Sequence, residues 1–119
     1  MSLRSRLHDL GKTPVEHQAD ALRTQSETEG GDDLTALAPR HLAVVCGTVR
    51  TVTLPPRRSV PALVAEVWDG NGSVNLVWIG RRSIAGIEPG VFLRARGRVA
   101  EVRGMPTIFN PSYEIVPTT

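Results

Sequence analysis

The chain has 119 residues, with 11 glycines, nine prolines and a net charge of +2. This length allows one domain with an additional arm, and so many turn-forming residues favour a β-rich protein over a helical bundle. The single cysteine, Cys46, excludes an intramolecular disulfide and indicates a reducing compartment. The start of the chain lacks the apolar core of a signal peptide, and no apolar run is long enough to span a membrane. We therefore expect a cytoplasmic protein.

Charge is divided unequally along the chain. Residues 1–39 hold four basic and seven acidic side chains, a net of −3, whereas residues 40–119 hold ten arginines and five acidic side chains, a net of +5. Arginine forks match phosphate geometry and stack on bases, so the second part favours nucleic acid as a partner. Arginine-rich surfaces also arise from codon usage in GC-rich genomes, and this alternative stays open.

The first third of the chain is expected to be helical. Residues 2–10 carry leucines at helical spacing and predict one short helix. Residues 13–16 form a capping box with Pro14 at the first helical position, and they start a second helix that should end near Leu22–Thr24. The polar, acidic residues 24–33 then predict a linker. We expect residues 1–40 to be a helical arm with an acidic linker, and residues 41–119 to be a separate domain.

A hairpin is the strongest local signal in the second part. Two β-rich runs, residues 61–68 and 73–79, flank Asp69-Gly70-Asn71-Gly72, the sequence type of a tight turn. Further strands are expected at residues 43–54, 91–102 and 107–116. The first and fourth strands carry a glycine in mid-strand (Gly47 and Gly97), which indicates a bulge or a sharp bend. The last strand should bend or lie at an edge at Asn110-Pro111.

This layout gives five strands, with the only substantial connector between the third and the fourth. A β-sandwich would normally have about seven strands. The expected fold class is therefore all-β with an N-terminal helical arm, the β part being a five-stranded Greek-key barrel of the OB-fold type.

Short motifs occur in order along residues 43–116. They are VCGTV (45–49), VWDGNG (67–72), LVW (76–78), EPG (88–90), GRV (97–99) and IFNPSY (108–113). In order and spacing they resemble a bacterial OB-fold nucleic-acid-binding family, whose best-known members are the wedge domain of the RecG helicase and the small OB domains of class II aminoacyl-tRNA synthetases. The resemblance implies binding of single-stranded or junction-like nucleic acid across the second and third strands, framed by loops 55–60 and 103–106. The chain has no helicase motor, so strand separation by force is not implied.

Strand alternation assigns the two faces of each strand. Inward positions are predicted to be Leu63, Ala65, Val67, Val74, Leu76, Trp78, Leu93, Ala95, Gly97 and Val99. Outward positions are predicted to be Val64, Glu66, Trp68, Asn75, Val77, Phe92, Arg94, Arg96 and Arg98.

Charge and aromatic stacking together are typical of grooves that bind single strands without sequence preference. The candidate nucleic-acid-binding residues are Arg57, Arg58, Trp68, Asn75, Arg94, Arg96, Arg98, Arg103 and Phe109. The alternatives are that Trp68 partly covers the barrel edge and that the row Arg94, Arg96 and Arg98 is a solvated face. Glu66 on the presumed binding strand is unfavourable for an anionic ligand.

No catalytic or metal-binding motif is present. The three histidines are scattered along the first part of the chain, and one cysteine provides no zinc spacing. We expect a protein that is not an enzyme, uses no cofactor or metal, and binds single-stranded nucleic acid, with DNA favoured over RNA. The alternative is a protein-interaction adaptor, or a homo-oligomer assembled through the N-terminal arm, because a fold does not fix a function.

Overall fold

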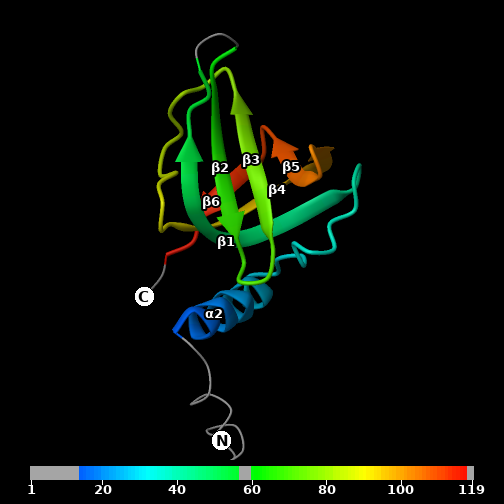
Figure 1. Cartoon of the computed structure of the whole chain (residues 1–119), viewed down its shortest axis with the longest axis vertical. Coiled ribbons are helices and arrows are strands. Elements are labelled where there is room, and N and C mark those ends of the chain that lie inside the picture. Colours follow the sequence, from blue (N-terminus) through cyan, green and yellow to red (C-terminus); the bar gives the residue numbers. More distant parts are fainter. Residues whose placement is uncertain (1–13, 57–59, 118–119) are drawn as a thin grey trace, which may run out of the picture.

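The computed structural model describes residues 14–56 and 60–117 (Figure 1). It consists of helix α2 (Pro14–Thr28) and strands β1 (Leu42–Thr53), β2 (Ala62–Trp68), β3 (Ser73–Ile79), β4 (Phe92–Val102), β5 (Met105–Phe109) and β6 (Ser112–Ile115). The predicted helix at residues 2–10 and the predicted cap at Thr13 lie outside the described residues. Within the described ranges, no helix is long and apolar enough to cross a membrane.

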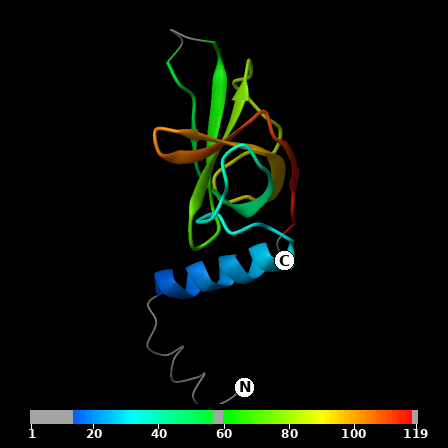
Figure 2. The same cartoon turned by 90° about the vertical axis from the view of Figure 1, so that its right-hand side faces the viewer.

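The strands close into a barrel. Strand β1 pairs with β4 through its first half and with β2 through its second half, and β2 pairs with β3, all antiparallel. Strand β5 then joins β3 in parallel and β4 in antiparallel pairing, so the ring runs β1-β2-β3-β5-β4 and back to β1 (Figures 1 and 2). This ring of five strands confirms the predicted OB-fold.

Strands β5 and β6 together form the predicted fifth strand. Both pair with β4: Val99 lies opposite Ile108, and Arg96 lies opposite Ser112. Between these pairs the fifth strand has one residue more than β4, and Asn110 takes a positive φ of 50°. The predicted bend at Asn110-Pro111 is therefore confirmed. It is fixed by the side chain of Asn110, whose Oδ1 accepts a hydrogen bond of 2.9 Å from the Ile79 amide.

Gly47 lies where β1 changes its pairing partner. A Cβ atom at this position would lie 2.5 Å from the carbonyl oxygen of Trp68, so only glycine lets the two backbones approach this closely. The predicted bend at Gly47 is thus correct. The bulge itself is displaced by three residues, because the register between β1 and β2 shifts between Val49 and Thr51.

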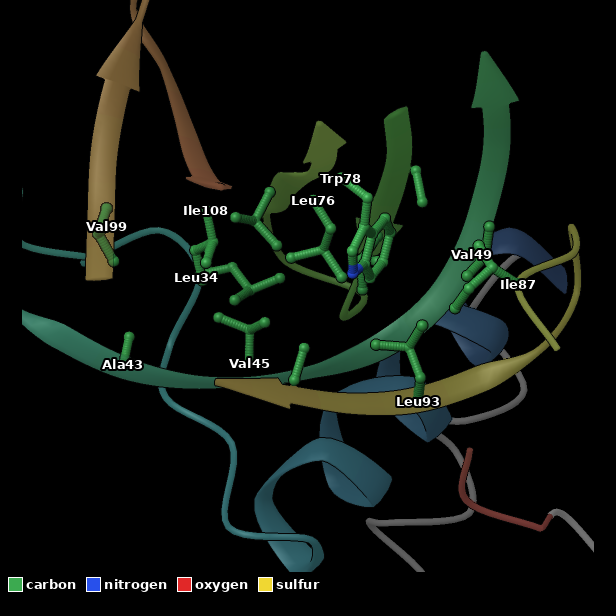
Figure 3. Packing of buried hydrophobic residues seen from close by; sticks show 14 of the residues in the cluster. Leu34, Ala43, Val45, Val49, Leu76, Trp78, Ile87, Leu93, Val99 and Ile108 are labelled. Carbon is green, nitrogen blue, oxygen red and sulfur yellow. The ribbon is translucent and has the colours of Figure 1, made fainter. Parts of the chain in front are cut away.

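The barrel interior holds the main hydrophobic core. Figure 3 shows Trp78 among the aliphatic side chains of β1, β3, β4 and β5. The Trp78 indole donates a hydrogen bond of 3.3 Å to the carbonyl of Pro111, and the Tyr113 ring meets it edge to face at 5.5 Å. The predicted alternation is confirmed: every predicted inward residue of β2 and β3 is buried, and the predicted outward residues are partly exposed.

Helix α2 packs against the end of the barrel where the β2–β3 turn lies (Figures 1 and 2). Leu22 contacts a second apolar cluster with Cys46 and Phe92. Phe92 does lie on the outer face of β4, as predicted, but α2 covers it and leaves it 2% exposed. Phe92 therefore shows that an outward position on a strand can still be buried when a helix packs over it.

The predicted linker is more ordered than expected. Helix α2 continues to Thr28, so the predicted end near Leu22–Thr24 is wrong, because the last turn buries Ser26. Asp32 then pairs with β1: its amide donates to the Val44 carbonyl at 2.7 Å, and its carboxylate accepts from the Val44 amide at 2.8 Å. Leu34 enters the barrel core at 3% exposure.

Candidate nucleic-acid interface

An apolar row crosses the outer face of three neighbouring strands. Val64 of β2 lies opposite Val77 of β3, and Val77 lies opposite Phe109 of β5. The two valines are partly exposed, and Phe109 is 46% exposed. In the next row of the sheet, Asn75 lies between Glu66 and Thr107. We call Val64, Val77 and Phe109 the apolar row.

Arg98 extends this row onto β4. Val99 and Ile108 are opposite one another and point into the barrel. Their neighbours Arg98, which precedes Val99, and Phe109, which follows Ile108, therefore point outward. The Arg98 guanidinium donates to the carbonyl oxygen of Arg40. Two of the predicted binding residues, Arg98 and Phe109, are thereby brought together with an arginine that the motifs did not single out.

Arg40, Arg98 and Phe109 line a surface cavity of about 600 Å³, which we call the β4–β5 pocket. Its remaining lining residues are Pro39, Val99, Ala100 and Glu101. The residues that line the pocket thus include two arginines, one exposed phenylalanine and one glutamate.

The other two arginines of the predicted row have different surroundings. Arg94 is committed to carboxylates: its Nη1 lies 3.8 Å from Glu29 Oε2 of α2, and its Nη2 contacts Glu114 of β6. Nη1 also donates to the Glu29 carbonyl at 3.2 Å. Arg96 is exposed and lies between Val44 of β1 and Ser112 of β6. The three arginines therefore do not act as one uniform row.

Trp68 is separated from these residues along β2. It lies at the end of the strand next to α2 and packs against the cluster that contains Leu22. The guanidinium carbon of Arg50 lies 4.3 Å from its ring centre, so one ring face is already covered. The loop between β1 and β2 joins the opposite end of β2, about 20 Å away at a strand rise of 3.3 Å per residue.

The framing loops are only partly described. Arg57 and Arg58 lie outside the described residues, and their role stays a prediction. Arg103 is exposed in the β4–β5 turn, with a φ of 53°. The sequence motifs missed Arg82, which donates to the Pro55 carbonyl at 3.2 Å and so supports the base of the β1–β2 loop. The hairpin register could have revealed Arg82. Ile79 at the end of β3 lies opposite Ala62 at the start of β2, so the residues that follow β3 lie near the loop that precedes β2.

No signal in the sequence marked Arg40. Its backbone takes a positive φ of 72°, which is uncommon outside glycine and follows no motif. Its amide donates to the Val99 carbonyl at 2.7 Å, which fastens the segment before β1 to β4.

The described residues contain no group of three or more His, Cys, Asp or Glu side chains that could hold a metal ion. Burial raises the pKa of the Cys46 thiol to about 11, with Arg94 acting in the opposite direction. Such a thiol stays protonated and unreactive at neutral pH.

No protein-family model matches the chain, and no curated protein matches it. Its fold is nevertheless similar to solved structures. A structure of a replication protein A heterotrimer bound to single-stranded DNA contains a chain with 17% sequence identity and a TM-score of 0.51, over 65% of this chain and 58% of that one.

A replication factor A related protein from Methanobacterium thermoautotrophicum is 15% identical, with a TM-score of 0.56, over 72% of this chain and 90% of that one. The HINb domain of p204 is 14% identical, with a TM-score of 0.59, over 76% of this chain and 49% of that one. The chain thus spans less than two thirds of the replication protein A chain and of the p204 chain. These likenesses show that the chain is an OB-fold protein. The resemblance to the RecG wedge and the synthetase domains stays a prediction.

Proposed function

We propose that this protein binds single-stranded nucleic acid along the outer face of β2, β3 and β5. The observation that carries the proposal is the apolar row, which sets Val64, Val77 and the exposed ring of Phe109 side by side across three strands. Bases of a single strand can stack on such a surface without regard to sequence, because every base has an aromatic face.

Charge supports the same ligand. Residues 40–119 have a net charge of +5, all of it from arginine. Arg98 and Arg103 lie at the β4–β5 side of the apolar row, and Arg82 lies at the base of the β1–β2 loop. Cations that flank an apolar surface bind the phosphates of a strand whose bases lie on that surface.

The chemical identity of the strand is proposed from likeness. One protein with this fold is described as bound to single-stranded DNA, which supports DNA over RNA. The motifs that resemble the RecG wedge and synthetase OB domains support single-stranded or junction-like nucleic acid. Contacts through charge and stacking give little sequence specificity.

Fluorescence anisotropy with a labelled oligothymidylate at several salt concentrations tests the proposal. We expect binding that weakens as salt rises, with a slope of about −0.7 per phosphate contact for a single strand. Val77→Glu should abolish it, because a carboxylate then stands in the middle of the apolar row. Ile115→Glu is the matched control, since it places the same charge on an exposed apolar position of β6. Absence of binding at low salt, or equal losses in both variants, would overturn the proposal.

One observation favours a protein partner instead. Leu54, Val60 and Ile79 are 45%, 63% and 44% exposed near the β1–β2 loop. Such exposed apolar residues also occur at protein interfaces. If these residues bind a second copy of the chain, light scattering of the full chain would show a mass above that of the monomer. Under this alternative, added oligonucleotide would leave the mass unchanged.

A further inference from the structure

We propose that the β4–β5 pocket binds one nucleotide of the strand, with the base on Phe109 and its phosphate at Arg98 and Arg40. This inference rests on the proposed function and deepens it. It extends the path of the strand beyond β2 and β3, around the barrel and onto β4.

The pocket has room for this ligand. Its volume of about 600 Å³ lies within the range of about 300–1,000 Å³ found for small-molecule sites. One wall carries Phe109, a ring left 46% exposed in water. A base stacked on this ring would remove apolar surface from water on both partners.

The guanidinium of Arg98 is held in place before any ligand arrives. Its Nη1 donates to the Arg40 carbonyl, and Arg40 is itself held by the hydrogen bond from its amide to Val99. A guanidinium carries five N–H donors, and the bond to the Arg40 carbonyl uses only the Nη1 group. The preorganised fork therefore has donors left for phosphate oxygens at a small entropic cost.

Glu101 is the acidic residue among those that line the pocket. It lies three residues beyond Arg98 on β4, about 10 Å along the strand. An odd separation places the two side chains on opposite faces of the strand, so the carboxylate points away from the Arg98 guanidinium. The phosphate is therefore expected at Arg40 and Arg98, with the base next to Phe109.

The chain offers an internal control for an NMR test, because it contains two phenylalanines. Phe109 is exposed, whereas Phe92 is 2% exposed beneath α2. Full-chain protein with ¹³C-labelled phenylalanine is titrated with the dinucleotide d(TpT). We expect the ring resonances of Phe109 to shift and those of Phe92 to stay in place. If backbone amides of β2 and β3 shift while the Phe109 ring does not, the pocket is not used and the strand contacts only the Val64 and Val77 part of the apolar row.

Variants give an independent readout by anisotropy with oligothymidylate. Phe109→Ala should weaken binding at least about fivefold, whereas Phe109→Tyr should keep it. Arg98→Gln should weaken binding and reduce the salt slope by about 0.7. Arg96→Gln is the control, because it removes the same charge from the same strand outside the pocket, and its loss of affinity should be smaller. Glu101→Gln should strengthen binding.

The two proposals fail in different ways. If Arg98→Gln binds within twofold of wild type while Phe109→Ala and Val77→Glu lose binding, the pocket inference is wrong and the proposed function stands. If wild-type protein does not bind at low salt, both are wrong.

Discussion

The guanidinium of Arg50 lies 4.3 Å from the ring centre of Trp68, in cation–π geometry. Arg50 occupies the extra position of the bulge between β1 and β2, and Trp68 ends β2. The bulge thus places the Arg50 side chain over the ring of Trp68, which packs between the barrel and α2.

Replacing Arg50 by methionine should therefore loosen Trp68. We expect a loss of about 0.5–1 kcal/mol in the free energy of unfolding, the usual range for an exposed cation–π pair. The fluorescence emission should also move to longer wavelength, because the indole gains contact with water. Urea denaturation and emission spectra measure both effects. Arg81→Met is the control, and equal losses in the two variants would contradict a specific role of the pair.

Replacing Gly70 by alanine should detach the β2–β3 turn from α2. Gly70 has a φ of 94°, and a Cβ there would lie 2.0 Å from the carbonyl oxygen of Ala19. Gly80 is a matched control, because its φ is 82° but its surroundings are open. Both variants should carry the backbone strain of about 1–2 kcal/mol, and only Gly70→Ala should add the clash with the helix. Hydrogen exchange should then show lower protection of the α2 amides in Gly70→Ala alone.

Arg94 is expected to hold α2 rather than nucleic acid. Its guanidinium is engaged by Glu29 and Glu114, so Arg94→Gln should leave oligothymidylate affinity within about twofold of wild type. The lost pairs are partly exposed, and we expect a destabilisation of no more than about 1 kcal/mol. Anisotropy and urea denaturation measure the two quantities. A loss of affinity as large as that of Arg98→Gln would restore the prediction that Arg94 contacts the ligand.

Cys46 should make stability depend on pH in the alkaline range. Burial raises its pKa from 9.0 to about 11 in the folded protein. The folded state therefore keeps the thiol proton to higher pH than the unfolded state. This contribution to stability is fully present below pH 9 and is lost as the pH rises from 9 through 11.

Thiol labelling offers a direct check on Cys46. At pH 8 the native protein should react with a disulfide reagent far more slowly than the protein in denaturant. Urea denaturation of Cys46→Ala should show a smaller fall in stability between pH 9 and pH 11 than wild type. Fast labelling of the native protein would contradict the burial of the thiol.

Local sequence determined much of the barrel. The Asp69–Gly72 turn and the alternation of the flanking runs correctly predicted the hairpin and its faces, because register and face follow from nearest neighbours in a strand. The end of α2 could not be predicted in this way. Ser26 is buried in the last turn of α2, and Asp32 is held by a hydrogen bond with Val44 of β1, 12 residues later in the chain.

The candidate site was predictable only in part. Arg98 could be identified as an outward residue and Phe109 as a binding candidate, but their meeting depends on the register between β4 and β5. Arg40 joins them through an unusual backbone conformation that no pattern of residue types announced. Arg94 looked equivalent to Arg98 in the alternating strand, and the difference between them comes from α2 and β6.

The change of partner along β1 also has a consequence for how the protein reaches its fold. Leu42 pairs with Arg98, far along the chain, whereas the β2–β3 hairpin joins residues separated by a short turn. Closing a long loop costs more chain entropy than closing a hairpin, so we expect the hairpin to form early and the β1–β4 seam to form last. During synthesis on the ribosome, the first half of β1 therefore stays unpaired until β4 has been made. Until then the apolar residues of β1 are open to association with other chains.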